Sequence, residues 1–152
     1  MKGDISEAYF NLQEAWTKRD ISLCKGNLTP DLHDYYRSKL EWMAVKHEVN
    51  VLENVRLLHA VPVSLKHFRD YNMDEIWVYI NGRMKDYTVN EVSKNIINGT
   101  KLNKNFIEFW QFKIKEDKWV LNKILQEDEF DFSTCDVFIE NGDKDLLKDK
   151  LL

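Results

Sequence analysis

Residues 51–65 read VLENVRLLHAVPVSL, and in this stretch the spacing of apolar side chains changes from a helical to an extended period. Most of its apolar residues have odd numbers, and most of its polar residues have even ones. Such alternation is typical of a long strand with one buried face. Pro62 cannot donate a hydrogen bond to a neighbouring strand, so we expect an edge strand or a bulge at that position.

Three more strands are predicted on the C-terminal side of this stretch. Residues 76–85 alternate again, and Gly82 within them predicts a bend. Residues 106–115 and 119–126 are predicted to form a hairpin around the short polar turn that separates them. Asn98-Gly99-Thr100 is expected to be a turn between the second strand and this hairpin.

Helical spacing dominates the residues on the N-terminal side. A first helix is predicted near residues 5–18, with Asp4 and Glu7 as a capping box at its start. Asp20 is expected to cap a second, short helix that runs to about Lys25.

A third helix is predicted from Thr29 to about Glu48, with Thr29 as the cap and Pro30 in the first helical position. Helices followed by long strands with hairpin-like connections indicate an α+β fold. We therefore expect N-terminal helices packed on one face of a curved, four-stranded antiparallel sheet.

Charge divides the chain into two parts. Residues 1–126 carry 19 basic and 17 acidic side chains, whereas residues 127–152 carry 3 and 9. We expect one α+β domain over residues 1–126 and an acidic C-terminal extension over 127–152, either a cap over the sheet or a separate tail. Because basic residues are not clustered, nucleic-acid binding is not expected.

The cysteines and the hydropathy pattern suggest a reducing compartment. Cys24 and Cys135 are the only cysteines and lie far apart, so two buried or idle thiols are the simplest interpretation and one long-range disulfide is the alternative. No stretch approaches the roughly 18 apolar residues of a membrane span, and the N-terminus has no signal-peptide pattern. We expect a cytoplasmic protein, or a domain of a longer protein anchored at the cytoplasmic face of a membrane.

Metal and nucleophilic chemistry have little support. Histidines that share a predicted element lie too far apart to bind one ion, although a composite site of His33 with His59 stays open. We predict no metal site. The sequence has no nucleophile elbow and no phosphate-binding loop, so we expect neither nucleophilic catalysis nor a cofactor.

Acid–base chemistry is the enzymatic alternative. A curved sheet covered by helices can leave a pocket in which a carboxyl or histidine has a shifted pKa. The candidates for lining such a pocket are Tyr35, Tyr36, His59, Asp86 and Tyr87. The plainer interpretation is that Asp86 caps a turn and the aromatic residues simply pack.

Large aromatic side chains occur on both predicted faces of the sheet. Trp77 and Tyr79 alternate with the apolar residues of the second strand, and Phe109 alternates with those of the third. Either the tail covers this second face or the face receives a partner. Trp77, Tyr79 and Phe109 are therefore candidates for a partner surface.

A set of short segments follows in order along residues 5–126: Gln13 to Asp20, Leu28 to Leu32, Leu52 to Val55, Ile80, Met84 to Tyr87, Gly99, Phe106, Glu108, Trp110, Phe112, Trp119, Leu121, Ile124 and Gln126. Together these segments resemble the Tim44-like domain family, which is named after a subunit of the mitochondrial inner-membrane import machinery.

The resemblance implies the cone-shaped α+β fold shared with nuclear transport factor two. It also implies a non-catalytic scaffold, bacterial and related to transport, that binds a protein or peptide partner or contacts a membrane peripherally. The alternative is a small-molecule-binding protein or acid–base enzyme of the same superfamily. Binding of anionic lipid is a third option, and its candidate residues are Lys101, Lys104, Lys113, Lys115 and Lys118. Oligomeric state is not predicted.

Overall fold

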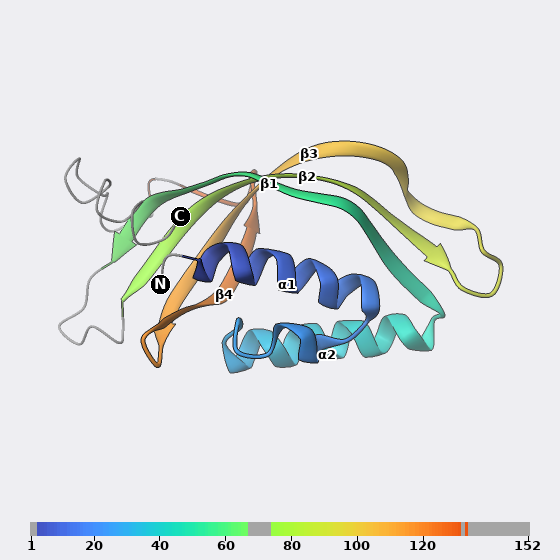
Figure 1. The fold of residues 1–152 in the computed structure, drawn as a ribbon, viewed down its shortest axis with the longest axis horizontal. Helices are drawn as coiled ribbons and strands as arrows, with labels where there is room; N and C mark the ends of the chain where they lie inside the picture. Colours follow the sequence, from blue (N-terminus) through green and yellow to red (C-terminus); the bar gives the residue numbers. More distant parts are fainter. Residues whose placement is uncertain (1–2, 67–73, 132, 134–152) are drawn as a thin grey trace.

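The computed structural model describes residues 3–66, 74–131 and 133 of the chain. Two α-helices and one short 3-10 helix precede four strands, as Figure 1 shows. The elements are α1 (Asp4–Lys18), η1 (Ile21–Cys24), α2 (Pro30–Val45), β1 (Glu48–Lys66), β2 (Glu75–Asn90), β3 (Ile96–Lys115) and β4 (Lys118–Gln126).

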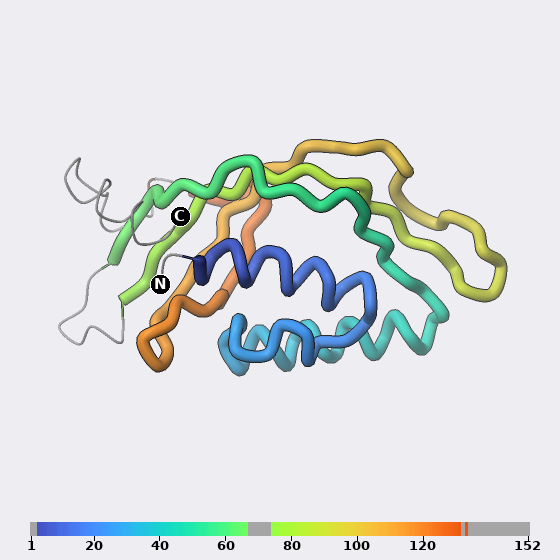
Figure 2. The backbone as a smooth tube through the Cα atoms, in the orientation of Figure 1, coloured from blue at the N-terminus to red at the C-terminus, as the bar shows by residue number. Residues whose placement is uncertain are grey.

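The four strands form one antiparallel sheet in the order β1-β2-β3-β4. The sheet arches over α1, and α2 lies along the same side of the sheet (Figures 1 and 2). This arrangement confirms the predicted α+β class with helices on one face of a curved antiparallel sheet. Pro62 lies in an edge strand next to a register shift, as its sequence position predicted.

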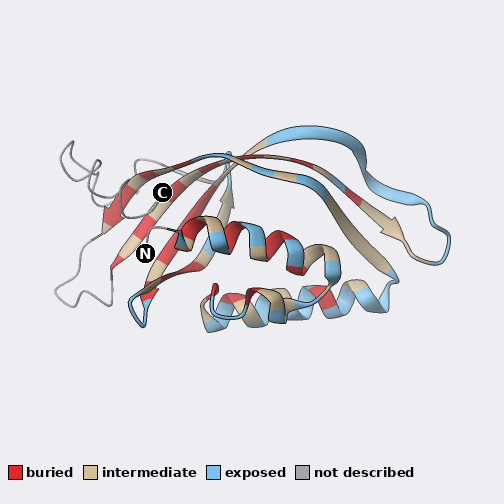
Figure 3. Ribbon diagram, viewed as in Figure 1, coloured by how far each residue is buried: buried red, intermediate tan, exposed pale blue. Residues whose placement is uncertain are grey.

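The core lies between α1 and the concave face of the sheet. Ile5, Tyr9 and Leu12 of α1 are buried, and they meet the buried Ile80 and Trp110 of the strands. Figure 3 shows this core as the red bands along α1 and along the half of the sheet that faces it. Burial of this apolar surface is the main stabilising term for the fold.

Tyr9 joins α1 to the sheet. Its ring is fully buried, stacks with that of Phe106 at 6.4 Å between ring centroids, and lies tilted against that of Trp110 at 5.5 Å. Its hydroxyl donates to the backbone carbonyl of Arg56 at 2.9 Å. A Cβ atom at Gly82 would overlap both the Tyr9 hydroxyl and the Phe106 ring, so only glycine lets β2 pass this close to α1.

Two predicted helix caps are wrong in detail. Gly3 occupies the N-cap position of α1, and the Asp4 carboxylate instead accepts a hydrogen bond from the backbone N–H of Trp119 at 3.0 Å. Thr29 is the N-cap residue of α2, but its hydroxyl bonds Asn122 rather than the helix. Both side chains therefore join a helix start to β4.

The cap of the second helix is confirmed, because the Asp20 side chain accepts from the backbone N–H of Ser22. The element itself is a 3-10 helix of four residues, Ile21–Cys24. The third helix is shorter than predicted: α2 ends at Val45, and Glu48 already belongs to β1.

The expected turn at Asn98-Gly99-Thr100 is also wrong, because these residues belong to β3 and pair with Thr88, Tyr87 and Asp86 of β2. β2 continues to Asn90 instead of ending near residue 85. Gly99 has a φ of 79°, and its Cα lies so close to the β2 backbone that a Cβ would overlap the carbonyl oxygen of Asp86. The glycine thus permits a strand irregularity rather than a chain reversal.

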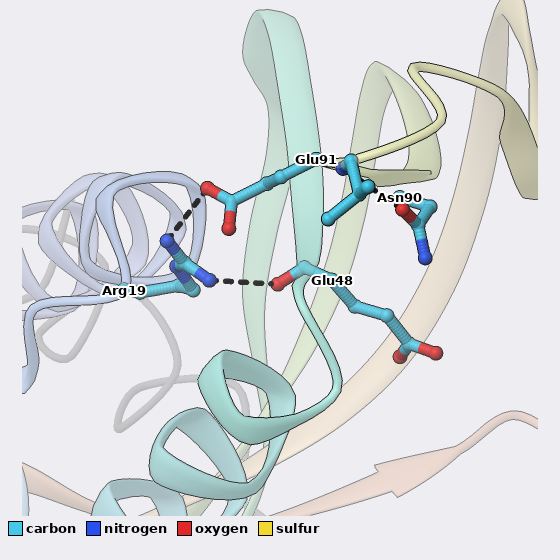
Figure 4. A network of polar contacts seen from close by, with 5 residues as sticks. Arg19, Glu48, Asn90 and Glu91 are labelled. Atoms are coloured by element: carbon cyan, nitrogen blue, oxygen red, sulfur yellow. Dashed lines mark hydrogen bonds and ion pairs between the residues drawn. The ribbon is translucent and has the colours of Figure 1, made fainter.

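Arg19, at the C-terminal end of α1, connects three segments (Figure 4). It has a left-handed backbone conformation, and its guanidinium donates to the carbonyl of Glu48 at 3.2 Å and to the Glu91 carboxylate at 2.7 Å. The backbone N–H of Glu91 in turn donates to the carbonyl of His47. These bonds fix the start of β1 and the β2–β3 turn against the end of α1.

Replacing Gly82 with alanine should destabilise the fold, because the new methyl group has no room beside Tyr9 and Phe106. Overpacking of this kind costs about 1–3 kcal/mol, measurable as a lower midpoint of urea unfolding. Gly3→Ala is the control, since a Cβ there meets nothing within 4 Å. Equal midpoints for the two variants would contradict the role given to Gly82.

Candidate functional site

A hollow of about 700 Å³ lies between the helices and the concave face of the sheet. All four strands and both α-helices contribute to it, so it exists only in the assembled fold. Its lining residues are Leu12, Gln13, Trp16, Tyr35, Tyr36, Lys39, Asn50, Leu52, Met84, Asp86, Leu102, Lys104, Asn105, Phe106, Glu108, Trp110, Ile124, Gln126 and Glu129.

Aromatic rings form the helix side of the hollow. Trp16 of α1 and Tyr36 of α2 lie 5.3 Å apart between ring centroids, and Tyr35 lies 5.6 Å from Tyr36. Trp110 forms part of the sheet side and is fully buried. These rings offer apolar surface with a few polar tips, which suits recognition of a ligand or a polypeptide segment.

Two carboxylates in the hollow are held by hydrogen bonds. Glu108 accepts from the indole N–H of Trp110 at 3.1 Å and from the side-chain amide of Gln126 at 3.0 Å. Asp86 accepts from the side-chain amide of Asn50 at 2.8 Å. The acceptor groups are therefore preoriented in the wall of the hollow.

Burial, and then the nearby Glu108 carboxylate, raise the pKa of Tyr36 well above its ordinary value of 10.0. The same two causes raise the pKa of Tyr9 behind the hollow. Both phenols therefore stay neutral at physiological pH, so Tyr36 can donate a hydrogen bond to a bound group but does not act as a base. Burial also raises the pKa of Cys24 to about 11, which keeps this thiol protonated and poorly nucleophilic.

Lysines accompany aromatic residues at the edge of the hollow. Lys39 lies 4.8 Å above the ring of Tyr35, which is 54% exposed. About two turns further along, at the C-terminal end of α2 and outside the lining, Lys46 lies 5.9 Å from the ring of Trp42, which is 61% exposed. Lys104 lines the opposite, sheet side. One lysine thus lines the helix side of the hollow and one the sheet side, together with the carboxylates Asp86, Glu108 and Glu129.

Three of the five predicted pocket residues, Tyr35, Tyr36 and Asp86, line this hollow. The structure places the other two outside its lining. His59 is exposed and pairs with Asn81, while the Tyr87 hydroxyl donates to Glu53 at 2.6 Å beneath the side chain of Lys101. The structure therefore brings three of the five candidates together at the hollow and leaves His59 and Tyr87 apart from it.

Sequence reasoning missed Glu108 and Trp16 as pocket residues. Glu108 lies two residues from both Phe106 and Trp110, which line the hollow, so its position in the strand did indicate the concave face. A carboxylate at such a position is the signal that could have identified it, since charged groups on an apolar strand face need partners.

The partner-surface candidates lie together on the outer face of the sheet, away from the helices. Tyr79 and Phe109 are in edge-to-face contact at 5.8 Å, and Phe130, beyond β4, stacks on Phe109 at 4.0 Å and contacts Trp77 at 5.1 Å. Phe109 is consequently only 4% exposed. The start of the acidic extension thus covers part of this face; residues 134–152 lie outside the described residues.

The five lysines considered for lipid binding do not form one group. Lys101 and Lys104 lie on the part of β3 that pairs only with β2, whereas Lys113, Lys115 and Lys118 lie at the β3–β4 hairpin. Two of the latter form ion pairs, Lys113 with Glu75 and Lys118 with Glu7.

Within residues 3–66, 74–131 and 133, no three histidine, cysteine, aspartate or glutamate side chains are grouped so that they could hold a metal ion. Nor does any helix in the same ranges have the length and apolar character needed to cross a bilayer. Cys24 is a free, buried thiol, and Cys135 lies outside the described residues.

Comparison with known proteins identifies the family. The model of the Tim44-like domain matches residues 2–126. The chain belongs to the Tim44-like domain family. No curated protein sequence matches it.

A solved structure shares the fold. The intermembrane space region of the chloroplast protein ARC6 superposes with a TM-score of 0.60 at 11% identity, over 82% of this chain and 93% of that chain. At this identity the likeness concerns the fold alone. It agrees with the matched family and with the cone-like arrangement of helices under a curved sheet.

The neutral phenol of Tyr36 has a testable consequence for stability at alkaline pH. Because its pKa is higher in the folded chain than its ordinary 10.0, the unfolded chain loses the proton first. Stability should be complete below pH 10 and fall as the pH rises above it. Urea unfolding between pH 8 and pH 11 measures this, and Tyr36→Phe should flatten the fall. An identical pH dependence in wild type and variant would contradict it.

Proposed function

We propose that this Tim44-like domain is a non-catalytic interaction module that holds a segment of a protein partner in the hollow, close to a membrane surface. The observation that carries the proposal is the hollow itself, an open, aromatic-walled site with preoriented hydrogen-bond acceptors. Tim44-like domains are associated with membrane-proximal protein interactions, and this association supports the same conclusion.

The chemistry of the hollow favours binding over catalysis. Burial moves the pKa of Tyr36 further above neutral pH, and the lining of the hollow contains neither histidine nor cysteine. Glu108 already accepts two hydrogen bonds, from Trp110 and Gln126, which hold its carboxylate in place in the wall. These features suit recognition of donors on a partner, such as backbone N–H groups, amides or lysine side chains.

The second candidate function is a small-molecule-binding protein or acid–base enzyme. Asp86 favours it, because this carboxylate lines the hollow together with Tyr36 and remains exposed to an entering ligand. If side chains filled the space between the helices and the sheet, the structure would favour a scaffold. If they enclosed an apolar cavity there, it would favour an enzyme. The hollow is intermediate, since it is neither filled nor enclosed by apolar side chains alone.

We place the domain in the cytoplasm or at the cytoplasmic face of a membrane, in a bacterial protein related to transport. A protein or peptide is the proposed partner, with peripheral contact to the bilayer as a second interaction. Flotation with vesicles of phosphatidylglycerol and phosphatidylethanolamine tests the membrane contact directly.

Site-specific photo-crosslinking tests the binding function. A benzophenone amino acid at Tyr35, at the edge of the hollow, should form a covalent adduct with one protein in the native host, whereas the same group at the exposed Lys123 of β4 should not. Asp86→Lys should reduce the adduct at position 35, because it reverses the charge of a hollow acceptor. Equal adducts from both positions would contradict the proposal. If the purified domain converted a small-molecule substrate and Asp86→Asn abolished that conversion, the enzymatic alternative would be established.

A further inference from the structure

β3 is much longer than β4, the strand that pairs with the edge of β3 opposite β2. β4 pairs with β3 only from Glu108 to Lys115, whereas β3 begins at Ile96 (Figure 1). Residues 96–107, which we call the open edge, therefore have a strand neighbour on one side only within the described part of the chain. Unpaired backbone donors and acceptors along such an edge are a template for another strand.

The opposite edge of the sheet, β1, is protected from further pairing along residues 48–56 and at Pro62. Its carbonyls at Glu48 and Arg56 accept hydrogen bonds from Arg19 and Tyr9, and the N–H of Leu52 donates to Thr17. Three register shifts and a proline also interrupt β1. Natural proteins protect edge strands with devices of this kind. The contrast makes the open edge of β3 the accessible one.

The open edge is exposed and mostly regular. Residues 96–105 are all exposed, as the pale blue arch of β3 in Figure 3 shows. The register with β2 shifts around Lys101 and Leu102, which leaves 103–107 as a regular stretch that continues directly from the end of β4. Leu102 is 66% exposed and offers an apolar contact beside this stretch.

Two lysines give the open edge its charge. Lys101 lies over the Tyr87 ring on the outer face, and Lys104 lines the hollow on the concave face. Neither forms an ion pair with another described residue. Several carboxylates of this region already accept hydrogen bonds from other groups: Asp86 from Asn50, Glu53 from the Tyr87 hydroxyl, and Glu108 from Trp110 and Gln126. A strand added at this edge would meet an available cation on each of its faces.

This charge selects among possible occupants. A second copy pairing through the same edge would bring basic residues against basic residues, and like charges across strands are destabilising. An acidic segment would instead gain ion pairs on both faces while its backbone completes the hydrogen bonds of β3.

We propose that the open edge of β3 binds an extended, acidic segment of a partner protein, which joins the sheet as a fifth strand in line with β4. The proposal rests on the proposed function of the chain as an interaction domain and specifies a second contact beside the hollow. Leu102 and Lys104 belong to both the edge and the hollow lining, so one partner can occupy both.

A synthetic peptide of alternating glutamate and valine, labelled with fluorescein, is the probe. Fluorescence anisotropy with the full chain should show saturable binding that weakens with salt. Hydrogen exchange should slow at the amides of residues 103–107 when the peptide is bound. The charge-reversed pair Lys101→Glu with Lys104→Glu should weaken binding about tenfold or more and should bind a lysine–valine peptide instead.

The control is the pair Lys115→Glu with Lys123→Glu, which makes the same change in net charge at exposed positions away from the open edge. Equal weakening by both pairs, or no binding to wild type, would overturn the proposal. The proposal would also fail if the amides of residues 103–107 exchanged slowly in the peptide-free chain and this protection disappeared in a chain that ends at Ser133. In that case the chain's own C-terminal extension would occupy the edge. The crosslink from position 35 tests the hollow separately, so either proposal can fail alone.

Discussion

The contact of Tyr9 with Gly82 is the constraint on which the rest of the structure depends. A tyrosine fully buried on α1 presses against a strand position that has no side chain, and its hydroxyl satisfies the Arg56 carbonyl at a bulge of β1. The stacked ring of Phe106 closes the contact from β3. The Tyr9 side chain thus contacts β1, β2 and β3 and joins all three strands to α1. Only glycine at position 82 leaves room for this contact.

The position of the hollow follows from this contact. Because α1 is fixed against the middle of the sheet, the strands continue past it and arch away, as Figure 2 shows. The space left between the arch and α2 is the hollow, and the Arg19 bonds hold its far end together (Figure 4). The same overhang carries β3 beyond β4 and leaves the open edge. Both proposed contacts therefore come from one feature of the fold.

The sequence predicted the elements well where local pattern and tertiary contacts agree. Alternation identified the strands, and Pro62 indicated an edge. Simple alternation along β1 would put His59 on the same face as Leu57. Register shifts on either side of Leu57 instead send His59 to the outer face, and bulges of this kind leave no clear sequence signal. The turn predicted at Gly99 is absent because the pairing of β3 with β2 outweighs the local preference of glycine for turns.

The most direct test of the account is the width of the hollow in the isolated chain. Spin labels at Tyr35→Cys and Leu102→Cys, with Cys135→Ser, face each other across it, and the buried Cys24 thiol stays unlabelled. Electron double resonance should give one narrow distance distribution, which broadens when Gly82→Ala displaces α1. A broad or bimodal distribution in the chain with native Gly82 would contradict a hollow preformed by the Tyr9 contact.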